Sequence, residues 1–124
     1  MFAVEGGVTV TPSHIDARPG ETVAVSCTTT SNENVVWLRQ NSSAPRAQYI
    51  TNGADGKVLK ELQNKYRAEK VGEKEYRLTI NIQKSDEGYI ICKQSNTEQV
   101  IANMTLTVSG TDIGAMCTIL SLAY

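Results

Sequence analysis

The residue types that most often carry chemistry are scarce in this chain. Its 124 residues include three cysteines and one histidine, His14. A zinc site of the usual kind needs four such ligands at regular spacing, so we expect no bound metal. Ser13 and Asp16 flank His14, but residues this close along one strand cannot form a nucleophilic triad. We therefore predict that the protein is not an enzyme, with no catalytic residues and no cofactor.

Two of the cysteines are placed to crosslink the fold. Cys27 and Cys92 each occupy an inward-facing position of an expected strand, and Trp37 follows Cys27 closely. A disulfide between them would join opposite sheets beside the indole, and closing so long a loop is worth roughly 4 kcal/mol. It would also indicate an oxidising compartment. Two buried free thiols in a cytosolic protein are the alternative.

The third cysteine, Cys117, lies in a C-terminal tail, residues 111–124, that is apolar without strand alternation. With the other two paired, Cys117 could link two chains or stay a free thiol. We interpret the tail as a linker, an expression remnant or the start of a membrane-proximal segment. An element that packs on the domain, or on a second copy, is a further alternative.

Composition narrows the class of protein. Hydrophobic residues make up 40% and charged residues 20%, which is ordinary for a globular chain. Twelve basic residues against thirteen acidic ones give a net charge of -1, so we expect no nucleic-acid partner. No apolar run approaches the roughly 20 residues that span a bilayer. We expect one soluble domain, residues 1–110, followed by the tail.

Alternating apolar and polar residues dominate the chain and predict strands. Pro12 interrupts the first of them, as at an edge strand with a break. Asn52-Gly53 and Asp55-Gly56 are strong turn dipeptides. Many short strands with frequent turns predict an all-β antiparallel sandwich or barrel. The expected strands are 8–10, 23–27, 34–40, 47–51, 66–68, 76–82, 89–94 and 100–108, with a loop and one helical turn over 57–65.

Four motifs make the prediction more specific. They are the spacing of Cys27, Trp37 and Cys92, the run Trp37-Leu38-Arg39-Gln40, the sequence Asp86-Glu87-Gly88 before Cys92, and the run Thr105-Leu106-Thr107-Val108-Ser109. Over about residues 5–110 the chain resembles the variable (V) set of the immunoglobulin superfamily, as in antibody and T-cell-receptor variable regions. The resemblance implies a two-sheet Greek-key sandwich with one disulfide, Cys27–Cys92, and a core that includes Trp37, Leu78, Ile80 and Ile90.

The chain departs from the family at two places. Ile90 stands where the family has its corner tyrosine, and Tyr89 comes one position too early. Val100 to Asn103 replaces the glycine-rich bulge before the last strand. These departures indicate a non-rearranged immune-type or adhesion receptor. The resemblance also implies an ion pair that closes one end of the sandwich, formed by Asp86 with Lys65 or Arg67.

Strand parity predicts a binding face. With Trp37 and Cys92 inward, the neighbouring positions on both strands point outward. The resemblance places these strands in the front (GFCC′) sheet. Their outward side chains would form a binding face, with Gln40 beside an apolar cluster of Val36, Leu38, Tyr49, Tyr89 and Ile91. In paired variable domains the residues matching Leu38, Gln40 and Ile91 lie at the dimer interface. Cover by another part of the same chain is the alternative.

Two sequons, at Asn41 and Asn103, are candidate N-glycosylation sites. Asn103 would point out of the front sheet, so a glycan there would compete with a face-to-face dimer.

We therefore predict an extracellular recognition module of an immune-type receptor, at the cell surface or secreted, that binds a protein partner through its front sheet. The partner would be a second copy or another V-type domain. Heterophilic binding through loops 28–33 and 95–98 is one alternative, and a structural bead of a multi-domain adhesion rod is another. We expect no small-molecule substrate and membrane contact only through parts outside this sequence, and residues 1–7 lack the pattern of a leader.

Overall fold

The computed structural model describes residues 7–30, 34–42, 44–53, 55–95 and 101–110. Cys117 and the 111–124 tail lie outside these ranges, as do most of the two candidate binding loops. The described elements are β1 (Val8–Thr11), β2 (His14–Ala17), β3 (Thr22–Thr29), β4 (Val35–Asn41), β5 (Gln48–Tyr49), η1 (Lys60–Leu62), β6 (Tyr66–Lys70), β7 (Glu75–Asn81), η2 (Lys84–Asp86), β8 (Gly88–Gln94) and β9 (Ile101–Val108).

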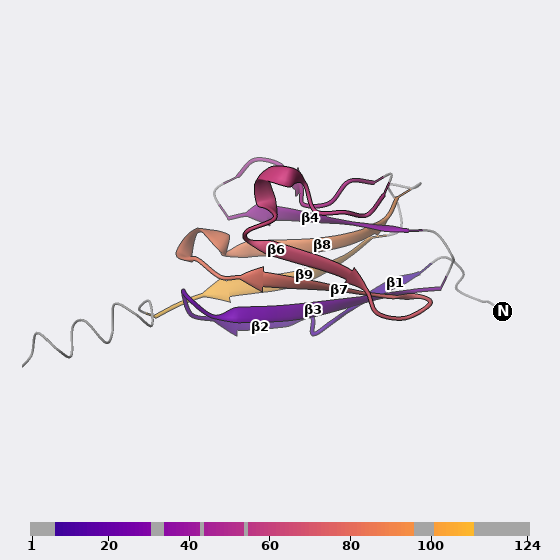
Figure 1. The fold of residues 1–124 in the computed structure, drawn as a ribbon. Coiled ribbons are helices and arrows are strands. Elements are labelled where there is room, and N and C mark those ends of the chain that lie inside the picture. The colour runs from indigo at the N-terminus through magenta and orange to yellow at the C-terminus, as the bar shows by residue number, and fades with distance from the viewer. Residues whose placement is uncertain (1–6, 31–33, 43, 54, 96–100, 111–124) are drawn as a thin grey trace, which may run out of the picture.

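The strands form two packed sheets, which confirms the predicted sandwich. The four-stranded sheet has the order β1-β3-β7-β6, and the five-stranded sheet has the order β2-β9-β8-β4-β5. In Figure 1, β3, β7 and β6 lie in front of β9, β8 and β4. All pairings within the sheets are antiparallel except that of β2 with β9, which is parallel.

The core lies between the sheets and forms around the disulfide. Cys27 and Cys92, separated by 65 residues, are bonded, and Trp37 pairs with Cys92 in the register of β4 and β8. The predicted core residues Trp37, Leu78, Ile80 and Ile90 are each at most 2% exposed. Alternating burial along β3 and β7 follows the alternation of their sequences, since successive side chains point to opposite faces.

The break at Pro12 moves the first strand from one sheet to the other. β1 pairs with β3 in the four-stranded sheet, whereas β2 pairs with β9 in the five-stranded sheet. The Thr11-Pro12 peptide bond between them is cis. A proline cannot donate to a strand ladder, so the interruption falls where the prediction placed it.

The region after β4 differs most from the sequence-based expectation. The strand expected over 47–51 is reduced to β5, Gln48–Tyr49. Ile50 is fully buried, and Thr51 forms an isolated bridge with Val58. A short 3-10 turn and then β6 follow, as predicted.

The two family departures have simple structural outcomes. Ile90 fills the core at 2% exposure, and Tyr89 points to solvent at 47% exposure. The register of β8 with β9 runs without a shift from Gly88↔Leu106 to Lys93↔Ile101, so no bulge interrupts it.

One end of the sandwich is closed by Asp86 and Lys65. The Lys65 Nζ donates to the Asp86 Oδ2 at 2.5 Å and to the Asn81 carbonyl at 2.9 Å. The backbone N–H of Gln83 donates to the same carboxylate. Arg67, the alternative partner, binds Glu69 instead. The ion pair implied by the resemblance is therefore Lys65–Asp86.

Tyr66 and Arg39 pack next to this pair. The Arg39 Nη1 donates to the Tyr66 hydroxyl at 3.0 Å. Burial raises the pKa of Tyr66 above its usual value, although the nearby Arg39 charge acts in the opposite direction. The phenol therefore stays neutral and can accept the arginine's hydrogen bond.

Candidate binding face

The outward side of the five-stranded sheet is the candidate site, and we call it the front face. Strand register arranges its side chains in rows that cross the sheet. The central row is Tyr49, Leu38, Ile91 and Asn103, from β5 to β9. One adjacent row is Gln40, Tyr89, Thr105 and His14, and the other is Val36, Lys93 and Ile101.

Val36 and Leu38 point outward as predicted, but they are not exposed. Val36 is 1% exposed and Leu38 is 7% exposed. The prediction that they form part of an exposed cluster is therefore wrong, and cover from within the chain accounts for their burial.

Two parts of the chain provide this cover. The Lys93 Nζ lies 5.6 Å from the centre of the Tyr49 ring. Because β4 lies between the strands of these two residues, their contact passes over the outward side of β4. At Val36, the segment after β5 closes in, since a Cβ built on Gly53 would be 3.4 Å from the Val36 Cγ2. This covering segment, which contains Gly53, directly follows β5, where the sequence predicted a longer strand.

The remaining predicted face residues are still accessible to a partner. Tyr49 and Tyr89 are 48% and 47% exposed, and Gln40 and Ile91 are half-buried. Ile101, at 48% exposure, extends this surface and was not singled out from the sequence. The inward positions of Met104 and Leu106 on the same strand would have predicted its outward direction by parity.

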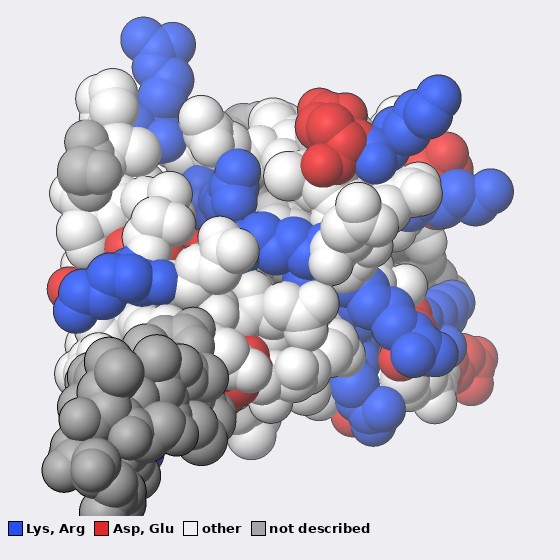
Figure 2. Space-filling view, turned by 60° about the vertical axis from the view of Figure 1, so that its left-hand side comes forward, with Lys and Arg blue, Asp and Glu red and all other residues white. Residues whose placement is uncertain are grey.

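The front face carries three of the four exposed large hydrophobic side chains among the described residues. Among the described residues, the exposed large hydrophobic side chains are Tyr49, Val71, Tyr89 and Ile101. All but Val71 point out of the five-stranded sheet. The view in Figure 2, turned towards the η2 end and the four-stranded sheet, shows Lys and Arg side chains across its middle. The exposed large apolar side chains of the described residues therefore gather on the outward side of the five-stranded sheet.

Asn103 stands near the middle of the front face. It lies opposite Ile91 on the neighbouring strand and is exposed, while Met104 after it is fully buried. Asn41, the other sequon residue, ends β4 and is half-buried.

A polar cluster lies at the β2 edge of the same face. The Asp16 carboxylate accepts hydrogen bonds from the Thr107 hydroxyl and from the His14 ring, the latter at 2.9 Å. These bonds lower the pKa of Asp16, with the Thr107 hydroxyl as the larger cause. Because the hydroxyl and the imidazole both bind the carboxylate, the histidine does not activate the hydroxyl as a nucleophile.

The part of the chain that the structure describes lacks two other kinds of feature. The described ranges contain no group of three or more His, Cys, Asp or Glu side chains that could hold a metal ion. None of the helices in those ranges has the length and apolar character of a membrane span.

Comparison with known families identifies the domain type. A family model described as the immunoglobulin V-set domain matches residues 10–109. Among curated proteins, none shows significant sequence similarity to the chain. The matched range contains every described strand except the start of β1, and both members of the disulfide.

Proposed function

Because the chain belongs to the immunoglobulin V-set family, whose domains are recognition and adhesion modules, we propose that it binds a protein partner through its front face. The domain would act outside the cell, as part of an immune-type receptor at the surface or in secreted form. The intact Cys27–Cys92 disulfide supports an oxidising compartment.

One observation carries the proposal: exposed Tyr49, Tyr89 and Ile101 all project from one sheet. Tyrosine is favoured at interfaces, since its ring buries a large area while its hydroxyl can stay hydrogen-bonded. A structural bead in a rod needs no such face. The side chains beneath, Val36 and Leu38, are already buried and would act as a rigid support for these contacts.

The partner that fits this face best is a second copy of the chain. In a two-fold contact, Gln40 of one copy can face Gln40 of the other, and two amide groups can exchange hydrogen bonds across the axis. Gln40 lies in the row of Tyr89 and beside that of Tyr49, so the glutamine pair would be flanked by aromatic rings.

Sedimentation velocity over a concentration series tests this proposal on protein made without glycans. We expect a reversible dimer that persists in the Cys117→Ser variant, since the contact is not covalent. Tyr89→Asp should weaken the dimer by about tenfold or more, because the substitution enters a two-fold interface twice.

Val71→Asp is the matched control. Val71 is 39% exposed but lies in the turn between β6 and β7, off the front face, so its variant should dimerise normally. Leu38→Asp is unsuitable as a test because a charge there would be buried. A monomer at every concentration would refute the homodimer and leave a different V-type domain, or the loops, as the binding route.

A further inference from the structure

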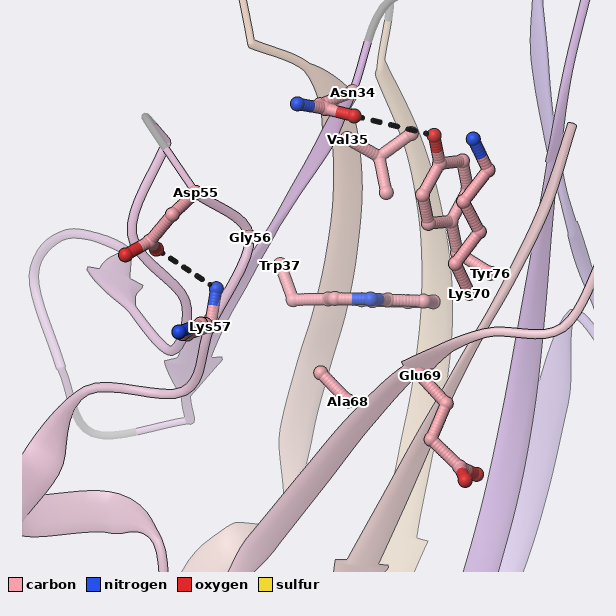
Figure 3. A pocket seen from close by; sticks show the side chains of 10 residues that line it. All are labelled: Asn34, Val35, Trp37, Asp55, Gly56, Lys57, Ala68, Glu69, Lys70 and Tyr76. Atoms are coloured by element: carbon pink, nitrogen blue, oxygen red, sulfur yellow. Dashed lines mark hydrogen bonds between the residues drawn. The ribbon is translucent and has the colours of Figure 1, made fainter. Parts of the chain in front are cut away.

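A cavity of about 250 Å³ opens between the two sheets at the edge formed by β5 and β6. Its walls come from β4, the 55–57 turn, β6 and the start of β7. Figure 3 shows Trp37 edge-on at its centre, Ala68 below, Tyr76 and Lys70 on one side, and Asp55 and Lys57 on the other. No strand extends either sheet at this edge within the described residues, which leaves the cavity open.

The indole of Trp37 gives the cavity an unused hydrogen-bond donor. Trp37 is 2% exposed, yet none of the described residues accepts a hydrogen bond from its indole N–H. The indole N–H lines the cavity, so it can donate to whatever occupies the space beside it. A ligand that places an acceptor beside the indole would use this donor.

At the rim of the cavity, the two carboxylates have hydrogen-bond or ion-pair partners, whereas the two ammonium groups have no carboxylate partner among the described residues. The Asp55 carboxylate accepts from the backbone N–H of Lys57 at 3.0 Å, and Glu69 binds Arg67 at 3.1 Å. The ammonium groups of Lys57 and Lys70 have no carboxylate partner among the described residues. The Lys70 Nζ instead lies 5.6 Å from the centre of the Tyr76 ring.

The size and walls of the cavity limit what it can hold. Trp37, Val35, Ala68 and Tyr76 provide apolar and aromatic walls. An apolar cavity of about 150 Å³ accepts benzene, and sites for drug-sized ligands begin at about 300 Å³. The volume here therefore suits a molecule with one ring or a branched aliphatic body of similar size.

We propose that this cavity is a binding site for a small carboxylate with an aromatic or branched apolar body. The body would pack against the Trp37 and Tyr76 rings, and the carboxylate would accept from the indole N–H and from Lys57 or Lys70. Charge-assisted bonds of this kind are stronger than neutral ones. The cavity lies between the sheets, away from the front face. The proposed carboxylate site therefore does not depend on the proposed front-face dimer.

The chain's single tryptophan makes the test direct. The indole N–H gives one side-chain resonance in a proton–nitrogen correlation spectrum, and phenylacetate is the probe. We expect saturable movement of that resonance to lower field on titration, because the N–H gains an acceptor. Phenylacetamide, which has the same body without charge, should bind roughly tenfold more weakly.

Three variants separate this site from general charge attraction. Ala68→Leu fills the cavity and should abolish the shift, with a native spectrum elsewhere as evidence of folding. Lys70→Gln should weaken phenylacetate severalfold and leave phenylacetamide unchanged. Lys60→Gln, an exposed lysine in η1 that does not line the cavity, should have no effect.

Several results would overturn the proposal. An indole resonance that stays fixed up to the solubility limit of phenylacetate would do so. So would unaltered binding in a folded Ala68→Leu variant, or equal weakening by Lys60→Gln and Lys70→Gln.

Discussion

At the residue scale, the buried carboxylate of Asp86 depends on Lys65. The Asp86 side chain is 4% exposed and the Lys65 side chain 19% exposed. Lys65→Met removes the cation and leaves the buried charge with fewer partners. Breaking a buried pair in this way costs about 3–5 kcal/mol, and we expect the lower end because Lys65 is partly solvated. Urea unfolding of the variant measures the loss.

Arg67→Met is the control for that substitution. The Arg67–Glu69 pair is largely exposed, at 74% and 37%, and such pairs contribute about 0–1 kcal/mol. Equal destabilisation by the two variants would contradict the assignment of Lys65 as the partner of Asp86.

The local sequence does not decide whether Lys65 or Arg67 is the partner of Asp86. Both Lys65 and Arg67 flank Tyr66, so parity puts them on the same side. The register of β6 with β7 decides between them. Lys65 lies level with Asn81, next to η2, whereas Arg67 pairs with Thr79, farther along the strand. That register depends on contacts between distant parts of the chain.

At the scale of elements, Gly88 sets how closely β8 approaches β4. Its φ is +148°, and a Cβ built there would lie 2.1 Å from the Gln40 carbonyl oxygen. Gly88→Ala should force the ends of the two strands apart and destabilise the fold by more than backbone strain alone. Thermal unfolding of the oxidised protein measures the effect.

Gly56→Ala is the matched comparison for Gly88→Ala. Gly56 has a φ of +71°, but nothing lies within 4 Å of an added Cβ. The variant should lose only the left-handed backbone preference, about 1–2 kcal/mol. A Gly88→Ala variant as stable as Gly56→Ala would show that the strands do not need this close approach.

Strands whose sequence alternates between apolar and polar residues were predictable, and irregular segments were not. The alternation over 76–82 predicted β7, and Pro12 predicted the broken first strand. The short β5 and the burial of Val36 were not predicted from the sequence, and the burial of Val36 has a clear reason. Strand parity gives the direction of a side chain but not what covers it, and the cover at Val36 comes from the irregular segment around Gly53.

At the scale of the whole molecule, a glycan on Asn103 would decide which surfaces remain open. Asn103 is exposed opposite Ile91, near the centre of the front face. We expect protein secreted from eukaryotic cells to stay monomeric if Asn103 is modified, because a branched sugar there separates two copies. Asn103→Gln should restore the dimer in sedimentation velocity.

Asn41→Gln is the control for the glycan, since Asn41 ends β4 beside a loop and away from the central row. A glycosylated wild-type chain that dimerises as well as Asn103→Gln would contradict the expected exclusion. Mass spectrometry of the secreted chain establishes which sequon is occupied.

The parallel pairing of β2 with β9 has a consequence under mechanical load. These strands lie near opposite ends of the described chain, and they are aligned from His14↔Thr105 to Ala17↔Val108. A pull on the two ends acts along the strands and would drag β2 and β9 past each other in shear. The hydrogen bonds of that pair would resist together rather than open one by one, so a domain held between two tethered surfaces would transmit tension before it extends.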